Sequence, residues 1–159
     1  MTDLKLLAAK YVLDDLDVDK LREIAVDAVC DGVDGRSMVF LAGATPADTP
    51  ADLRELFVSA LREQGVQLPS TLDAMVHLIQ HVASDVAEAR RSVSDGVGEI
   101  GYLLHCAEHD ADFVGTGDPR LGLERVFALH HSADAVHSAQ RRLEIDAAII
   151  KECAAIGRR

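Results

Sequence analysis

The chain has 159 residues, of which 48% are hydrophobic and 27% charged, a composition typical of a globular protein long enough to form one domain with a buried core. Acidic residues outnumber basic ones by 27 to 16, which gives a formal net charge of −11, and aromatic residues are scarce, with no tryptophan. This balance disfavours binding to nucleic acids and to anionic membranes, because both require a basic surface.

Apolar residues recur at intervals of three and four along almost the whole chain, which predicts helices rather than strands. The first helix is expected over residues 4–12. The second is expected over residues 21–29, with Asp17 or Asp19 as its N-terminal cap. The apolar segment 37–43 fits either a short helix or a buried strand, and its helical neighbours favour the helix.

Hydroxyl-bearing residues mark the starts of the next two helices. Thr49 followed by Pro50 is typical of a helix N-terminus, since the hydroxyl accepts a backbone hydrogen bond and proline has no N–H to satisfy there. This helix is predicted to stop at Gly65. Ser70 begins a variant of the capping box, and glycines farther along predict a kink or a new helix start near Ser94.

The last third of the chain is expected to contain a loop over residues 110–117 and one long helix that begins at Asp118 and Pro119. The predicted architecture is therefore all-α, with five or six helices in one compact bundle-like domain over residues 1–159 and a long C-terminal helix. A division into two halves near residues 65–69 and a small strand in the segment after residue 37 are the alternatives.

The C-terminal helix carries an apolar seam whose members alternate in steps of three and four, as in a coiled coil. The seam consists of Val126, Leu129, Ala133, Val136, Gln140, Leu143, Ala147, Ile150 and Ala154. Ile145 and Ile149 lie on the opposite face of the same helix. The sequence therefore leaves two interpretations: the helix breaks near Leu143, or its end is buried on both sides by another subunit.

All seven histidines lie between residues 77 and 137, and four of them form two pairs one helical turn apart: His77 with His81, and His105 with His109. Neutral imidazoles at this spacing are a common way to hold zinc. The second pair belongs to the sequence His105-Cys-Ala-Glu108-His109. It resembles the H-x-x-E-H signature of the inverzincin metallopeptidases, in which the histidines bind zinc and the glutamate polarises a water. One alternative function is therefore a zinc-binding protein or metal-dependent hydrolase with His105 and His109 as metal ligands and Glu108 as the catalytic residue.

Three observations weigh against this peptidase interpretation. The resemblance covers five residues, and the chain lacks the strand pattern of the α+β fold that such peptidases have. On a helical wheel, moreover, both histidine pairs fall opposite the apolar stripes of their helices. We therefore expect both pairs to face solvent or a partner.

Arg125 and His130 suggest a further alternative function, that of a ribonuclease. Their spacing resembles the R-x4–6-H motif of the HEPN ribonucleases, which are also all-α. The net negative charge opposes RNA binding, and this motif acts only where the two residues meet across a dimer.

The first half of the chain carries a series of short segments that mark helix boundaries. They are Leu21-Arg-Glu-Ile-Ala25, Phe40-Leu-Ala-Gly43, Asp52-Leu-Arg-Glu-Leu-Phe57 and Leu61-Arg-Glu-Gln-Gly65. This pattern resembles the N-terminal half of a group of small, uncharacterised bacterial all-helical proteins. The resemblance implies a helical fold and supplies no catalytic residues.

These observations together favour a non-enzymatic, acidic, all-helical protein-interaction module of the adaptor, immunity or antitoxin kind, with no cofactor. The charge of −11 directs it towards a basic protein partner, and the two-sided apolar pattern of the C-terminal helix indicates a homodimer through that helix. Cys30, Cys106 and Cys153 are dispersed and odd in number, which indicates reduced thiols. Without a signal-peptide pattern or a long apolar segment, the expected location is cytoplasmic.

Overall fold

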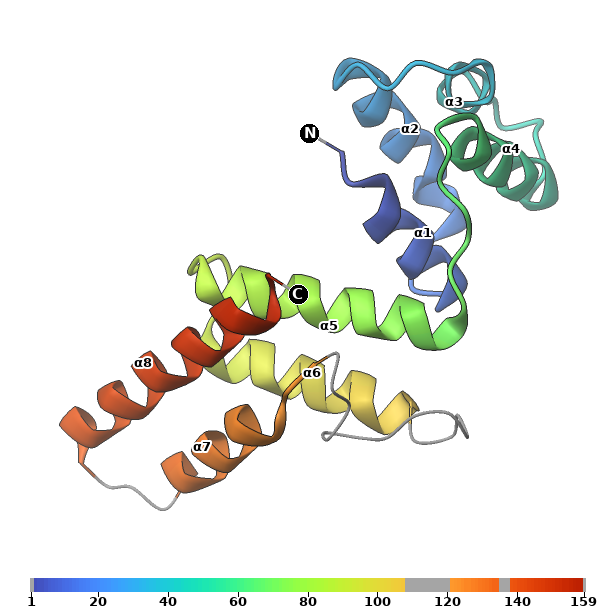
Figure 1. The fold of residues 1–159 in the computed structure, drawn as a ribbon. Helices are drawn as coiled ribbons and strands as arrows, with labels where there is room; N and C mark the ends of the chain where they lie inside the picture. Colours follow the sequence, from blue (N-terminus) through green and yellow to red (C-terminus); the bar gives the residue numbers. More distant parts are fainter. Residues whose placement is uncertain (1, 108–120, 135–137, 159) are drawn as a thin grey trace. The chain divides into compact units, whose positions relative to one another are not determined.

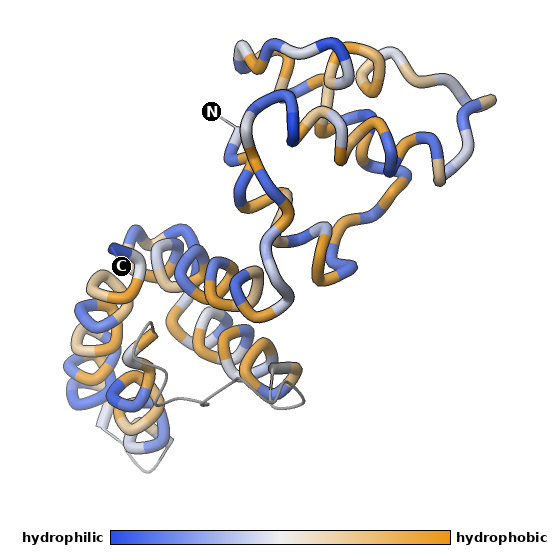
Figure 2. The backbone as a smooth tube through the Cα atoms, turned by 45° about the vertical axis from the view of Figure 1, so that its right-hand side comes forward, coloured by the Kyte–Doolittle hydropathy of each residue, from blue (hydrophilic) through white to orange (hydrophobic). Residues whose placement is uncertain are grey.

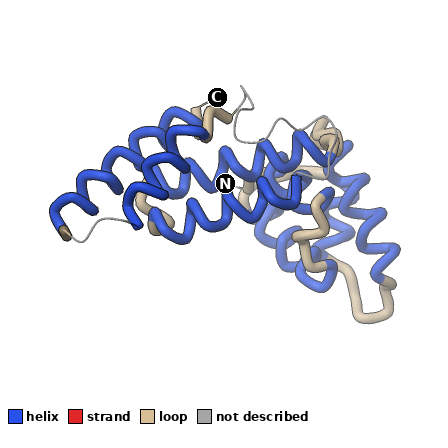
Figure 3. The backbone as a smooth tube through the Cα atoms, turned by 90° about the horizontal axis from the view of Figure 1, so that it is seen from below, coloured by secondary structure: helices blue, strands red, loops and turns tan. Residues whose placement is uncertain are grey.

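The computed structural model describes residues 2–107, 121–134 and 138–158, which consist of helices and the segments between them (Figure 3). No strand occurs in these ranges, so the predicted all-α fold class is confirmed. They contain eight α-helices and one short 3-10 helix, where five or six helices were expected. The chain separates into two units, residues 1–74 and residues 75–159, so a single compact bundle is not confirmed (Figure 1).

The first unit contains a short helix, α3, that packs against both α2 and α4. Its elements are α1 (Leu4–Val12), the 3-10 helix η1 (Val18–Lys20), α2 (Leu21–Cys30), α3 (Arg36–Ala42) and α4 (Pro50–Glu63). Hydrophobic and hydrophilic residues alternate along each helix, as expected for amphipathic helices (Figure 2). The fully buried side chains at the centre of this unit include Leu21, Met38, Leu41, Phe57 and Leu61.

Side-chain caps explain where several of these helices begin. Asp3 accepts hydrogen bonds from the N–H groups two and three residues later, both at 3.0 Å, and starts α1. The predicted cap of the second helix is wrong: α2 follows Lys20 without a side-chain cap, and Asp17 instead caps η1, which directly precedes it. Thr49 and Asp52 form a complete capping box at the start of α4, and the hydrogen bonds from Thr49 lower the pKa of Asp52. The predicted start of α4 at Thr49 and Pro50 is thus confirmed.

The start of α3 depends on a residue of another helix. Gly35 precedes α3 and has no side chain with which to cap it. The backbone N–H of Ser37 donates instead to Glu63 Oε2 at 3.0 Å, and its hydroxyl donates to Glu63 Oε1 at 2.7 Å. These hydrogen bonds lower the pKa of Glu63, which lies at the end of α4. The segment 37–43 is therefore helical, as favoured from the sequence, but its cap is non-local.

The second unit contains most of α5 (Thr71–Ala87), together with α6 (Val93–Ala107), α7 (Glu124–Asp134) and α8 (Ala139–Ile156). α7 packs on α8, and α6 contacts both. The fully buried side chains of this unit include Ile79, Val82, Ile100, Leu121, Leu123, Ile149 and Ile156. Among the described helices, none combines the length and apolarity that crossing a membrane requires.

The predicted new helix start near Ser94 is confirmed at the junction of α5 and α6. Ala89 has a positive φ of 56°, and the N–H of Arg90 donates to the carbonyl of Asp85 at 2.8 Å, which ends α5. Ser92 then caps α6 by accepting a hydrogen bond at 3.1 Å from the N–H three residues later.

The prediction of one long C-terminal helix is wrong. α7 ends at Asp134 and α8 begins at Ala139, because Ser138 adopts an extended conformation and its side chain accepts a hydrogen bond from the N–H of Arg141. The expected break near Leu143 is also not observed, since Leu143 lies inside α8. The predicted loop 110–117 and the cap at Asp118 and Pro119 lie outside the described residues.

The predicted seam is correct in α7 and wrong in α8. Val126 and Ala133 of α7 are buried. In α8, however, Leu143 is 64% exposed, whereas Ile145 and Ile149 on the opposite face are buried. The face of α8 that contacts the rest of its unit is therefore the one opposite the predicted seam.

Candidate functional site

The predicted zinc site lies only partly within the described residues. His105 is in the last turn of α6 with an exposed side chain, whereas Glu108 and His109 fall outside the described ranges. Within those ranges, no group of three or more histidine, cysteine, aspartate or glutamate residues is placed to hold a metal ion. The assignment of His105 and His109 as ligands and of Glu108 as catalytic residue stays a prediction.

The other histidine pair is less exposed than expected, because α5 is buried over much of its circumference. His77 and His81 are both half-buried. His81 Nε2 lies 3.6 Å from Asp85 Oδ2, and Asp85 Oδ1 lies 2.8 Å from Arg90 Nε. Hydrogen bonds to Asp85 and Glu88 raise the pKa of Arg90. These contacts stabilise the C-terminal end of α5. Among the described residues, they do not form a group of ligands that could hold a metal ion.

Arg125 and His130 are not brought together within the chain. Arg125 Nε lies 3.1 Å from Glu152 Oε1, an ion pair that joins α7 to α8. His130 is half-buried beside His131, with ring centroids 6.3 Å apart. Five residues along a helix turn about 140° around its axis, so Arg125 and His130 point in different directions. The ribonuclease interpretation gains no support from this geometry.

A surface that the sequence analysis did not single out lies on the outer side of α2. Asp19, Arg22, Glu23, Val26 and Asp27 line a hollow of about 610 Å³. All five residues are exposed, and Val26 exposes 42% of its surface. A hollow that combines charged side chains with an exposed aliphatic one is suited to binding another chain.

The amphipathic character of α2 explains why these side chains share one face. Leu21, Ala25 and Ala28 are fully buried and fix the inner side of the helix. Glu23 and Asp27 are four residues apart and lie together on the outer side. The core of the first unit thus forces these two carboxylates into solvent.

A second, smaller hollow adjoins the first at Asp19 and Arg22. It measures about 260 Å³ and is also lined by Ala44, Thr45, Pro46 and Asp48 of the segment between α3 and α4 and by Pro50 and Leu53 of the first turn of α4. Asp48 holds this segment in shape by accepting hydrogen bonds from the N–H and the hydroxyl of Thr45, at 2.6 and 3.0 Å. We name the two hollows together, with the residues that line them, the α2 surface.

Three charged residues of the α2 surface, all on α2 itself, form no ion pair within the described part of the chain. No ion pair among the described residues involves Arg22, Glu23 or Asp27. Like charges four residues apart destabilise a helix by a few tenths of a kcal/mol, and a carboxylate in the last turn opposes the helix dipole. Helix stability therefore does not explain why an acidic residue stands at position 27.

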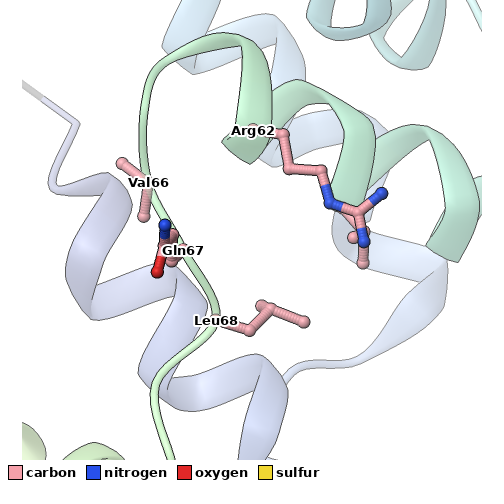
Figure 4. A pocket seen from close by; sticks show the side chains of 5 residues that line it. Arg62, Val66, Gln67 and Leu68 are labelled. Atoms are coloured by element: carbon pink, nitrogen blue, oxygen red, sulfur yellow. The ribbon is translucent and has the colours of Figure 1, made fainter.

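Another hollow lies at the C-terminal end of α4. Val58, Arg62, Val66, Gln67 and Leu68 line this space of about 390 Å³. Arg62 extends from α4, and Val66, Gln67 and Leu68 come from the segment that follows it (Figure 4). The lining contains one cation and no acid, base or nucleophile, so it offers no constellation for catalysis.

The sequence does contain a signal for the α2 surface. Asp19, Glu23 and Asp27 follow one another at intervals of four, which is the spacing of one helix face. The sequence analysis treated Asp19 only as a candidate cap and did not follow the acidic periodicity. The smaller hollow also depends on the segment between α3 and α4, whose position no local pattern reveals.

Comparisons of the chain with protein-family models, with curated proteins and with solved structures find no match. The resemblance of the first half to small bacterial all-helical proteins therefore stays a prediction.

Proposed function

We propose that the chain is a non-enzymatic protein-interaction module that binds a basic, amphipathic helical segment of a partner protein on the α2 surface. The observation that carries this proposal is the hollow that Asp19, Glu23 and Asp27 line together with Arg22 and the exposed Val26. A helix that inserts an aliphatic side chain beside Val26 would bring flanking lysines or arginines close to the carboxylates.

Charge supports the choice of a basic partner and also limits where its basic residues can lie. The net charge of −11 attracts a cationic segment over a distance and raises its association rate. Arg22 is the one cation that lines both hollows, so it disfavours a lysine at that point and favours an acidic or uncharged residue there. The α2 surface would thus select a pattern of charges as well as a sign.

Fluorescence anisotropy of a labelled synthetic peptide tests the proposal with the full chain. The probe is a peptide of about 18 residues with leucines along one helical face and lysines elsewhere, long enough to cover α2 and the adjoining segment. Saturable binding that weakens as sodium chloride rises from about 0.05 to about 0.5 M is the expected result, because salt screens exposed charges. A peptide with glutamates in place of the lysines is the control and should not bind. Failure of the lysine peptide to bind at low salt would overturn the proposal.

Matched variants place the binding on α2. Glu23→Gln combined with Asp27→Asn removes two charges from the α2 surface and should weaken binding about tenfold. Asp34→Asn combined with Glu55→Gln makes the same change in net charge at exposed positions that do not line the hollows, and should have little effect. Val26→Asn changes no charge and should weaken binding through the apolar contact. Equal losses in the two double variants would show charge attraction without a site.

A further inference from the structure

The helix α8 has apolar side chains on two opposite faces. One face is buried within the second unit by Ile145, Ile149, Cys153 and Ile156. The other face carries Leu143, Ala147, Ile150 and Ala154, which we name the outer stripe. Leu143 is 64% exposed, Ile150 is 36% exposed and Ala147 is also exposed.

Helix geometry shows that the outer stripe is directed away from the core. At about 100° per residue, Leu143, Ile150 and Ala154 fall within about 60° of Ala147 around the helix axis, whereas Ile149 falls about 160° away. The four residues follow one another in steps of four, three and four. This is the heptad spacing with which one helix packs along another.

We propose that the outer stripe is the surface through which two copies of this chain associate, with their α8 helices antiparallel. This interface is independent of the α2 surface, because it lies on another helix in the other unit. It would make the protein a dimer that presents two α2 surfaces.

The distribution of charge favours a second copy as the occupant of the outer stripe. α8 carries three basic and three acidic residues, so it has no net charge, and the rest of the chain accounts for the whole of −11. These residues are Arg141, Arg142, Lys151, Glu144, Asp146 and Glu152. A strongly basic partner gains no attraction at α8, and a second copy meets the smallest repulsion there.

The sizes of the side chains favour the antiparallel direction. The outer stripe reads large, small, large, small: Leu143, Ala147, Ile150 and Ala154. In an antiparallel pair, Leu143 meets Ala154 of the second copy and Ile150 meets Ala147 of the second copy, so every contact joins a large and a small residue. In a parallel pair each residue meets itself, which crowds the leucines and leaves a gap at the alanines.

The charged residues beside the stripe agree with this direction. Glu144 and Lys151 are both exposed on the same flank, seven residues apart. Antiparallel pairing places Glu144 of each copy beside Lys151 of the other, which forms two equivalent ion pairs in a two-fold symmetric dimer. Glu144 also lies 3.2 Å from Arg141 in its own helix, a contact that orients its carboxylate.

Sedimentation velocity of the full chain tests the interface. The wild-type protein should move from the chain mass of 17.1 kDa towards twice that mass as its concentration rises to the millimolar range. Leu143→Glu should remain monomeric over the same range. Val39→Glu is the matched control, because Val39 of α3 is 55% exposed and receives the same charge, and it should dimerise like the wild type. A wild-type chain that stays monomeric, or a Leu143→Glu variant that still dimerises, would overturn the proposal.

Exchange of the flanking charges tests the direction. Glu144→Lys alone and Lys151→Glu alone should each weaken dimerisation about fivefold, and the double variant should recover most of it. Absence of recovery would exclude the antiparallel arrangement. Circular dichroism confirms that each variant is helical, and the monomeric Leu143→Glu variant should still bind the lysine peptide. The proposed dimer and the proposed peptide binding can therefore fail independently of each other.

Discussion

Gly96 of α6 lies so close to α5 that even one additional methyl group at this position should change the stability of the protein. A Cβ atom added at Gly96 would lie well inside van der Waals distance of Val86 Cγ2. Val86 is only 1% exposed and β-branched, so its side chain has little freedom to move aside. Gly98, two residues later in the same helix, has no neighbouring atom of the described structure within 4 Å of such a Cβ.

The expected magnitude follows from two opposing effects. Replacing glycine by alanine inside a helix stabilises the folded state by about 0.5–1 kcal/mol. Overpacking by one methyl group in a rigid core costs about 2–3 kcal/mol. Gly96→Ala should therefore lower the free energy of unfolding by about 1–2 kcal/mol, and Gly98→Ala should raise it by about 0.5–1 kcal/mol.

Urea unfolding monitored by circular dichroism measures both variants, and a double-mutant cycle identifies the contact. In a Val86→Ala background the obstructing methyl group is absent, so Gly96→Ala should there stabilise the protein as Gly98→Ala does. The coupling energy between the two positions should be about 2–3 kcal/mol. The same stabilisation by Gly96→Ala and Gly98→Ala in the wild-type background would refute the close packing of α5 and α6 at this point.

Three further predictions concern other parts of the structure. Phe57→Ala removes a fully buried ring from the first unit and should lower the free energy of unfolding by about 3–5 kcal/mol in urea titrations; a loss below about 1 kcal/mol would contradict its place in the core. Hydrogen bonds from Ser37 hold the pKa of Glu63 below its usual 4.5, so the stability contributed by this carboxylate is present above that value and is lost as the pH falls through the lowered pKa of the folded state. Glu63→Gln should flatten the decline of the urea midpoint between about pH 5 and about pH 3, and an unchanged decline would count against the cap. Burial raises the pKa of the Cys153 thiol to about 11, so alkylation near neutral pH should label the exposed Cys30 in the native protein and Cys153 only after unfolding, as peptide mapping would show.

The start of α4 was predictable because its signal is local. Thr49 and Pro50 act within a few residues of the helix N-terminus that they form, and the observed α4 begins at Pro50 as expected. The same holds for α1 and for the new start after Ser92. A cap needs only neighbouring residues, so a sequence pattern is enough to find it.

The end of the chain was not predictable in the same way, because α8 has two apolar faces of similar strength. Leu143 and Ile150 satisfy the period of a helix as well as Ile145 and Ile149 do. Which pair is buried depends on how α8 packs within the second unit, and the apolar period alone does not show this. The separate start of α8, which Ser138 caps, was also missed, because the predicted apolar seam runs across it.

The candidate site was only partly accessible to sequence reasoning. The acidic periodicity of Asp19, Glu23 and Asp27 is visible in the sequence, and so is the overall charge that favours a basic partner. The hollow between α2 and the segment near Asp48 is a tertiary feature, formed by residues about 25 positions apart. The predicted ligands Glu108 and His109 lie outside the described residues, so the zinc interpretation is neither supported nor opposed by the geometry.

The cap that Glu63 supplies to α3 has a consequence for the order in which the first unit assembles. A helix of seven residues without a cap of its own is too short to persist alone, so α3 becomes helical only once the last turn of α4 is in place. Fraying of that turn would release the amide of Ser37, and hydrogen exchange throughout α3 should then be no slower than at the end of α4. The two helices behave as one cooperative folding unit, and the local stability of α3 is set by a residue more than twenty positions away.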